Sequence, residues 1–294
     1  MTTRSVKDRL LAGFSCTSAL LLTAGFAAII GFLIVQGVPS LNLELIFADT
    51  SVQDAVFLRQ QVFDGLFPAM AGTLFLVFLS IGMALPLGLA TGIWLAEYAP
   101  PYLKKSFGII VDILAGIPSI LVGLFGFSVT IFLHTNYNNR IFPCLLISAL
   151  SLAFLVLPYI VKMTQGAIES IPLHVRLTAP SMGASKFENI FYVLLPSSLS
   201  DILSGIVLAI GRCAEDTAVI MLTGVVASAG IPKSVFSNFE ALPFYIYYTA
   251  SEYADHSELI KGYGAALILL MICTGLFVLA HLIKYWIKQK TRIR

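Results

Sequence analysis

The sequence predicts an all-α, polytopic membrane protein with six transmembrane helices and with both termini in the cytoplasm. Three observations lead to this prediction. Mean hydropathy is +0.90 and only 12% of the 294 residues are charged, whereas soluble domains average about 25%. Several apolar runs reach the roughly 20 residues that a helix needs to cross the hydrocarbon core of a bilayer. Lysine and arginine are also divided unevenly among the segments between these runs.

Six runs meet the length criterion, and we expect spans at residues 10–35, 65–96, 107–133, 141–161, 202–226 and 262–283. The first lies in a charge-free stretch over residues 10–43, which is too long for the ~7–15 apolar residues of a signal peptide. We therefore expect it to remain as a membrane anchor. The chain then divides into an anchor helix with an outer segment (1–64), a core of five helices with a cytoplasmic loop at about 163–200 (65–285), and a basic cytoplasmic tail (286–294).

The orientation follows from the basic residues, which are enriched in cytoplasmic segments. With the N-terminus inside, 13 of them lie in inner segments and 4 in outer segments, and Arg212 falls within a span. The inner residues are Arg4, Lys7, Arg9, Lys104, Lys105, Lys162, Arg176, Lys186, Lys284, Lys288, Lys290, Arg292 and Arg294, and the outer ones are Arg59, Arg140, Lys233 and Lys261.

Two outer segments, about 36–64 and 233–261, are each long enough for a short helix. The second is rich in aromatic residues, which either form an interfacial belt or provide a docking surface for an external partner. These residues are Phe236, Phe239, Phe244, Tyr245, Tyr247, Tyr248 and Tyr253.

Glycine and proline recur in the second and third spans, and two interpretations are open. Small residues allow close helix packing in membranes. Alternatively, the segment from Ala115 to Ser119 breaks a helix where it lines a cavity, since irregular backbone is tolerated only in such places. The residues concerned are Gly82, Pro86, Gly88, Gly92, Gly116, Pro118, Gly123 and Gly126.

The cytoplasmic loop is predicted to contain two short helices around Gly183, which can adopt a sharp turn without a Cβ penalty. The first covers about residues 174–182. The second starts at Ser185, with Glu188 completing a capping-box pattern, presents an apolar face, and ends at Pro196. The loop is either an amphipathic connector on the membrane surface or a docking element. The apolar face consists of Phe187, Ile190, Phe191 and Leu194.

Arg212 lies about ten residues into the fifth predicted span, roughly 15 Å deep. Glu215 and Asp216 share its helical face and can pair with it. This group is either a structural ion pair or, with the adjacent Thr217, a gate or path for an oxyanion. Arginine suits phosphate because its planar fork donates two parallel hydrogen bonds. A neighbouring carboxylate can accept a hydrogen bond from a protonated phosphate oxygen, which sulfate cannot offer.

The loop from Leu177 to Ala184, with Leu195 and Pro196 after it, resembles the signature loop of ABC importer permeases. In that family a Glu-Ala-Ala, three variable residues and a Gly form a helix-turn-helix that docks on the ATPase. Leu177 and Thr178 stand where the family usually has Glu and Ala. The residues expected to couple to the ATPase are Arg176, Leu177, Ala179, Gly183, Ala184 and Phe187.

Three further segments, 93–100, 115–126 and 211–218, are similar to the phosphate-specific permeases within the binding-protein-dependent inner-membrane component family. The last usually reads Gly-Arg-Ala-x-Gly-Glu-Thr-Ala there, whereas Glu215 and Asp216 replace the Gly and the Glu here. The resemblance covers roughly residues 65–285. It implies the type I ABC importer permease fold and a location in the inner (plasma) membrane.

The resemblance further implies the membrane subunit of an ATP-driven phosphate importer. Its expected partners are a second related permease, an ATP-binding cassette ATPase dimer, an external phosphate-binding protein and the lipid bilayer, with no nucleic acid. No Gly-x-x-x-x-Gly-Lys-Ser/Thr loop is present, so ATP and Mg²⁺ are expected on the ATPase, and no cofactor, bound metal or catalytic residue is expected on this chain. The alternatives are an ABC permease for another oxyanion, such as sulfate or molybdate, and an ion-coupled secondary carrier. Such carriers commonly show internal repeats, and no convincing repeat is visible.

Overall fold

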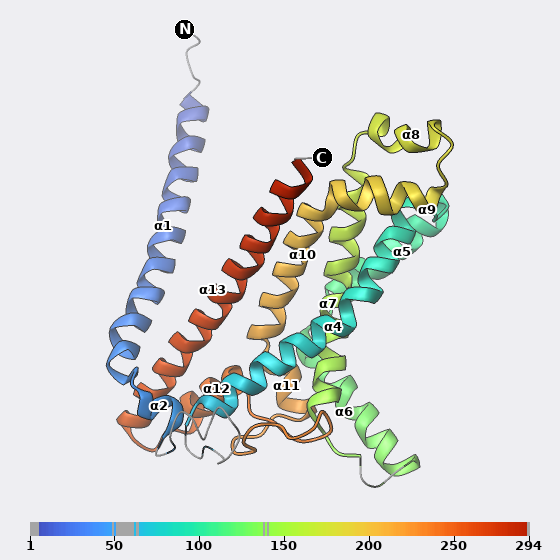
Figure 1. Ribbon diagram of the computed structural model, residues 1–294. Coiled ribbons are helices and arrows are strands. Elements are labelled where there is room, and N and C mark those ends of the chain that lie inside the picture. The colour runs from blue at the N-terminus through green and yellow to red at the C-terminus, as the bar shows by residue number, and fades with distance from the viewer. Residues whose placement is uncertain are drawn as a thin grey trace.

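The computed structural model describes residues 6–48, 50, 62, 65–137, 139 and 141–292 (Figure 1). Arg4, Arg59, Arg140 and Arg294, which the charge count includes, and most of the outer segment 51–64 lie outside these residues. The chain begins with α1 (Val6–Gly37), a 3-10 turn η1 (Val38–Ser40) and α2 (Leu43–Phe47). The elements after α2 are α4 (Phe67–Glu97), α5 (Pro101–Ala115), α6 (Ser119–Asn136), α7 (Leu145–Glu169), α8 (Leu173–Ser181), α9 (Lys186–Asn189), the π-helix η2 (Ile190–Leu194), α10 (Leu195–Glu215), α11 (Thr217–Thr223), α12 (Leu242–Glu252) and α13 (His256–Arg292).

Six helical segments in the described chain are long and apolar enough to cross a membrane, as the sequence predicted. The start of α1, the end of α13 and the α8–α9 pair lie at one end of the molecule, and α2, α12 and the end of α6 lie at the other (Figure 1). We call these the cytoplasmic and outer ends, following the distribution of basic residues. Residues 242–252 form the short outer helix expected in the second outer segment.

The third predicted span, 107–133, is wrong as a single helix. Helix α5 ends at Ala115 and α6 begins at Ser119, so the chain breaks at Gly116–Pro118. Proline lacks an N–H and disfavours helical backbone in the residue before it, and the N–H of Gly116 closes α5 on the carbonyls of Asp112 and Ile113. The break predicted within Ala115–Ser119 is therefore confirmed, whereas its role in lining a cavity stays a prediction.

The fifth predicted span, 202–226, is also interrupted, at Asp216 between α10 and α11. At its other end the prediction that Pro196 ends the second loop helix is wrong, because α9, η2 and α10 form one continuous helix from Lys186 to Glu215. The N–H of Leu195 donates to the carbonyl of Ile190, five residues earlier. Pro196 has no N–H to donate to the preceding turn of an α-helix. The π-helical turn, which is wider than an α-helical one, lies directly before Pro196.

Helix α7 continues two turns beyond the predicted end of the fourth span, to Glu169. Its cytoplasmic end carries charged side chains that pair with α5. Lys162 forms an ion pair with Asp112, and Glu169 lies 2.6 Å from the Nζ atom of Lys104. These pairs give the charges partners on the neighbouring helix, while Thr164, Ala167 and Ile168 in the same turns are buried against the bundle.

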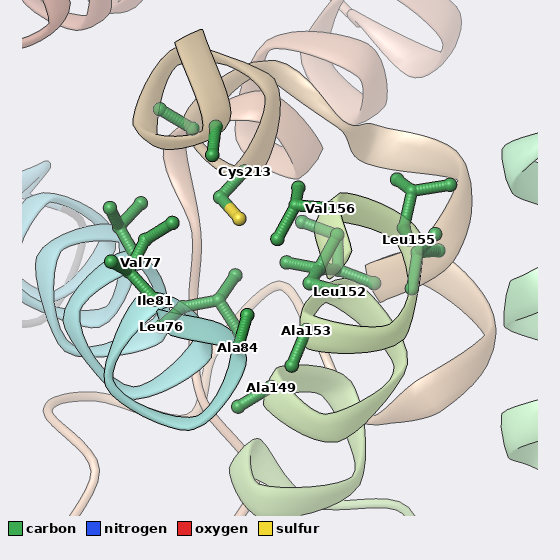
Figure 2. Close-up of a cluster of buried hydrophobic side chains, with 14 of the residues drawn as sticks. Leu76, Val77, Ile81, Ala84, Ala149, Leu152, Ala153, Leu155, Val156 and Cys213 are labelled. Carbon is green, nitrogen blue, oxygen red and sulfur yellow. The ribbon is translucent and has the colours of Figure 1, made fainter. Parts of the chain in front are cut away.

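The core of the protein is the contact between α4 and α7, joined by α10. Figure 2 shows Leu76, Val77 and Ile81 of α4 facing Leu152 and Val156 of α7, with Cys213 of α10 above them. The six-helix bundle is therefore centred on three helices that are far apart in sequence.

Close approach of α4 and α7 depends on Gly88 and Gly92, which are four residues apart on α4. A Cβ atom on Gly88 would lie 2.6 Å from Cγ2 of Ile160, and one on Gly92 would lie 2.6 Å from Cβ of Thr164. Carbon atoms do not approach so closely, so the two helices could not keep this distance with larger residues. This is the small-x-x-x-small pattern of helix pairs in membranes.

We expect Gly92→Leu to destabilise the protein by about 1–3 kcal/mol, the usual cost of overpacking a core. Gly82→Leu on the same helix is the matched control, because a Cβ atom there meets nothing within 4 Å. Unfolding in mixed detergent micelles, followed by circular dichroism, measures both. Equal stability of the two variants would contradict the role given to Gly92.

Candidate functional site

The predicted loop helices form an exposed pair at the cytoplasmic end. Gly183 adopts φ +88°, the left-handed conformation that the sequence predicted. Ser185 accepts a hydrogen bond from the N–H of Glu188 at 3.2 Å, and Glu188 accepts one from the N–H of Ser185 at 2.7 Å, which confirms the capping box. The pair is therefore held in shape by its own turn and cap.

The exposed surface of this pair includes several large apolar side chains. Leu177 and Phe187, both predicted as coupling residues, are exposed, and Ala179 and Ala184 are half-buried beside Gly183. Three further residues that were not predicted to couple to the ATPase are also exposed: Leu173, Met182 and Tyr192. Their signal was present, since large apolar side chains in an otherwise polar loop indicate a contact surface. Met182 and Tyr192 border a groove of about 380 Å³.

Arg176 differs from the other predicted coupling residues because it points toward the bundle. It forms an ion pair with Glu97, the last residue of α4, and its backbone carbonyl accepts a hydrogen bond from Nδ2 of Asn189 at 3.0 Å. The prediction grouped Arg176 with an exposed surface, and only the three-dimensional arrangement identifies its partner, 79 residues away in sequence.

The charged group of the fifth span is assembled as predicted, but its members have different roles. Arg212 lies in the last turn of α10, later in the helix than the sequence indicated. Its Nη1 atom is 3.3 Å from Oε1 of Glu215, and its Nη2 atom is 3.5 Å from Oδ2 of Asp216. The next residue, Cys213, lies in the core cluster with residues from the middle of α4 and α7. Arg212 is therefore at mid-height in the bundle.

Asp216 is 3% exposed and caps α11, because its Oδ1 atom accepts a hydrogen bond from the N–H of Val219 at 2.9 Å. Aspartate at an N-cap satisfies an N–H group that the helix leaves free. Glu215, by contrast, is 63% exposed and Arg212 is 38% exposed. Thr217 opens α11 and is half-buried. Arg212 thus stands between a fixed carboxylate and an exposed one.

Polar side chains continue from Arg212 along one exposed face of α10. Ser197, Asp201, Ser204, Arg212 and Glu215 recur at intervals of three, four and eight residues, and no other part of the described chain buries them fully. We call these five residues the α10 polar face. The apolar Leu208 is also exposed on this face, between Ser204 and Arg212. Lys284 of α13 donates a hydrogen bond to the hydroxyl of Ser204 at 2.7 Å.

The exposed face of α1 has the opposite chemistry. From Leu10 to Val35 its exposed large side chains are apolar, as expected for contact with lipid. Charged side chains in a membrane span face a protein interior or water rather than lipid. Contact with lipid would therefore be unfavourable for the charged members of the α10 polar face.

At the outer end, a cavity of about 420 Å³ lies between the chain at 226–230, α12 and the start of α13. Burial raises the pKa of Glu240, which lines it, although the carboxylate accepts hydrogen bonds from the N–H groups of Gly230, at 2.7 Å, and of Ala229. Phe236, Tyr247 and Tyr253 are exposed nearby in sequence, whereas Phe239 is buried. The aromatic belt and the docking surface both stay predictions for this segment.

Residues 88–293 match the family described as "Binding-protein-dependent transport system inner membrane component". The chain therefore belongs to this family, and it is a multi-pass inner-membrane protein whose six spans fit that assignment.

Several relatives of this chain are named as permeases of phosphate transport systems. The chain is 31% identical over 238 residues to phosphate transport system permease protein PstA 1 of Mycobacterium tuberculosis strain H37Rv, covering 80% of this chain and 75% of the relative. It is 26% identical over 276 residues to the permease PstA of Haemophilus influenzae, covering 93% of each.

Solved structures confirm the fold. An inward-facing form of the MetNI methionine ABC transporter aligns with a TM-score of 0.60 and 16% identity, covering 76% of this chain and 95% of that one. A bacterial ABC transporter that imports alginate aligns with a TM-score of 0.60 and 18% identity, covering 94% and 98%. The chain has the fold of the membrane subunits of ABC importers.

We expect Asp216→Ala to lower stability by about 0.5–2 kcal/mol, the usual cost of losing an N-cap acceptor. Asp216→Asn keeps a side-chain oxygen that can accept from Val219, so it should lose much less. Thermal unfolding of the detergent-solubilised protein compares the two. If both variants lost the same stability, the ion pair with Arg212, rather than the cap, would be the important contact.

Proposed function

We propose that this chain is the transmembrane subunit of an ATP-driven importer of inorganic phosphate, and that the α10 polar face lines the path of the anion. The observation that carries this proposal is the α10 polar face itself, exposed along a membrane-spanning helix with Arg212 at mid-height. The names of the relatives support phosphate as the substrate.

The exposure of this face has a direct physical consequence. A charged side chain at the centre of a bilayer costs about 2.5–3.5 kcal/mol even on insertion scales, and Arg212 and Glu215, which lie near mid-height, would both incur this cost against lipid. A second, related permease subunit placed opposite the α10 polar face removes these charges from lipid. The path for phosphate then runs between the two subunits.

Asp216 is held in place more firmly than Glu215, and this difference suggests how an anion can bind Arg212. Asp216 is held by its cap contact, so it stays beside Arg212 and keeps the guanidinium in place. Glu215 is exposed and makes a single contact at 3.3 Å, so phosphate can displace it from Arg212. Displaced Glu215 can then accept a hydrogen bond from a protonated phosphate oxygen, a donor that sulfate lacks.

The exposed apolar surface of α8 and α9 is where the ATPase docks in this proposal. Gly183, Leu177, Met182 and Phe187 contribute to that surface. ATP and Mg²⁺ bind the ATPase dimer, and no cofactor or catalytic residue is assigned to this chain. An external phosphate-binding protein delivers the substrate at the outer end.

The experiment that tests the proposal begins with co-purification of the tagged chain from native membranes and mass spectrometry of the assembly. The expected partners are an ATP-binding cassette protein, a second permease and a phosphate-binding protein. The assembly, reconstituted in proteoliposomes with the binding protein outside and ATP inside, should take up labelled phosphate but not labelled sulfate. Uptake of sulfate or molybdate in place of phosphate would assign a different oxyanion, and phosphate uptake without ATP would indicate an ion-coupled carrier.

We expect Arg212→Gln to reduce phosphate uptake at least about tenfold, because a charge-assisted hydrogen bond is worth about 1.5–3 kcal/mol and 1.4 kcal/mol corresponds to a factor of ten. Arg212→Lys should keep only part of the activity, since it loses the bidentate fork. Uptake is compared at matched levels of assembled complex.

The triple change Arg212→Gln, Glu215→Gln and Asp216→Asn distinguishes a transport role from a structural one. It removes all three charges and keeps the α11 cap acceptor, and replacing an ion pair by neutral groups is often tolerated. The triple variant should therefore assemble without recovering uptake. Near-normal uptake would mean that the ion pair is only structural.

We expect Gly183→Val to leave the protein in the membrane but to weaken binding of the ATPase, because a β-branched residue is strongly disfavoured at positive φ. Gly183→Asn, which tolerates this backbone conformation, should bind normally. Gly166→Val is a second control, at an exposed cytoplasmic glycine where a Cβ atom meets nothing within 4 Å. Pull-down of the ATPase by each variant gives the comparison, and equal binding by all three would contradict the importance of the turn.

A further inference from the structure

We infer that the ion pair between Arg176 and Glu97 is the mechanical connection through which the α8–α9 pair moves α4, so that Glu97 is a positioning residue for transport. This inference rests on the proposed docking of an ATPase on α8 and α9. The observations that carry it are the contacts made by the last turn of α4.

Both loop helices are attached to the cytoplasmic end of α4. Arg176 of α8 pairs with the carboxylate of Glu97, and the two side chains are only 24% and 12% exposed. Lys186 of α9 donates to the backbone carbonyl of Glu97 at 3.3 Å, and its Nζ atom lies 5.3 Å from the centre of the Tyr98 ring. Asn189 joins the two loop helices through its hydrogen bond to the carbonyl of Arg176.

The position of Glu97 makes these contacts more than a surface ion pair. A carboxylate at the C-terminal end of a helix meets the negative end of the helix dipole, which is unfavourable. Arg176 and Lys186 supply the positive charge that offsets it, and both come from the loop rather than from α4 itself. The negative charge at the end of α4 is therefore neutralised only when the α8–α9 pair contacts it.

Helix α4 can carry a displacement from this point to the rest of the protein. It spans the bundle as a helix of 31 residues, about 46 Å at 1.5 Å per residue. Gly88 and Gly92 hold it against α7. Near its outer end, Thr73 accepts a hydrogen bond at 2.9 Å from the N–H of Leu242, at the start of α12. A movement of α8 that pulls on Glu97 is thus passed to α7 and to the outer face.

An apolar cluster also joins the loop helices to the end of α4, and it includes the partly buried Val175 of α8. Ile171, Ile190 and Leu194 form a buried cluster with Ile168, and the nearest residues of α4 in it, Ile93 and Ala96, are partly buried. The cluster seats the loop on the helix ends. The ion pair fixes one residue of α8, Arg176, to one residue of α4, Glu97.

The test measures labelled phosphate moved per ATP hydrolysed, in the reconstituted complex with its ATPase and binding protein. We expect Glu97→Gln and Arg176→Gln to assemble and hydrolyse ATP but to lower this ratio at least about fivefold, the low end of typical coupling between sites. The charge exchange Glu97→Arg with Arg176→Glu should restore the ratio to within about twofold of wild type, because it re-forms the pair and places the cation at the favourable end of α4.

The matched control is Lys104→Gln, which breaks the cytoplasmic ion pair between Lys104 and Glu169 that joins α5 to α7 without touching α8 or α9. Its ratio should equal that of the wild type. A wild-type ratio in Glu97→Gln, a parallel loss of hydrolysis and transport, or an exchange variant no better than the single variants would overturn the inference. If the wild-type chain itself bound no ATPase, the proposed function would fail instead.

Discussion

The contact between α4 and α7 is the interaction on which the other features depend. Gly88 and Gly92 allow the two helices to pack closely against each other. Helix α10 packs against the surface that α4 and α7 form together. Dispersion and close packing provide this stability, because apolar side chains gain little by leaving lipid for one another. With the three helices fixed, Arg212 is held at mid-height and Glu97 is held at the cytoplasmic end, where the loop helices meet it.

Much of the fold could be predicted from the sequence because the bilayer imposes simple rules. Span number follows from the length of apolar runs, and the arrangement of the ends follows from the basic residues. The local geometry of Gly183 and the Ser185 cap was also predictable, since each depends on residues within a few positions. The extension of α7 beyond the apolar run was not predictable, because a polar sequence at the end of a span is typical of a loop. Its charged residues have partners on α5 that only the folded structure identifies.

The sequence was least informative about helix breaks within apolar runs and about contacts between residues far apart in the chain. The breaks at Gly116–Pro118 and Asp216 interrupt runs whose hydropathy is continuous. The three charges around Arg212 could be grouped from their spacing, yet spacing could not separate Asp216, which caps α11, from Glu215, which is exposed. The partner of Arg176 was hidden because Glu97 ends a different span, and only the folded bundle brings the two together.

The isolation of α1 has a consequence for the membrane around the protein. Its apolar run extends over 31 residues, about 46 Å, whereas the hydrocarbon core is about 30 Å thick. Within the chain, contacts fix α1 mainly near its outer end, where Gly37 and Phe32 meet Tyr263 of α13. A helix longer than the core tilts or thickens the bilayer around it. A thinner bilayer therefore leaves more of α1 to be accommodated by tilt or by local thickening, while its contacts with α13 restrain the outer end.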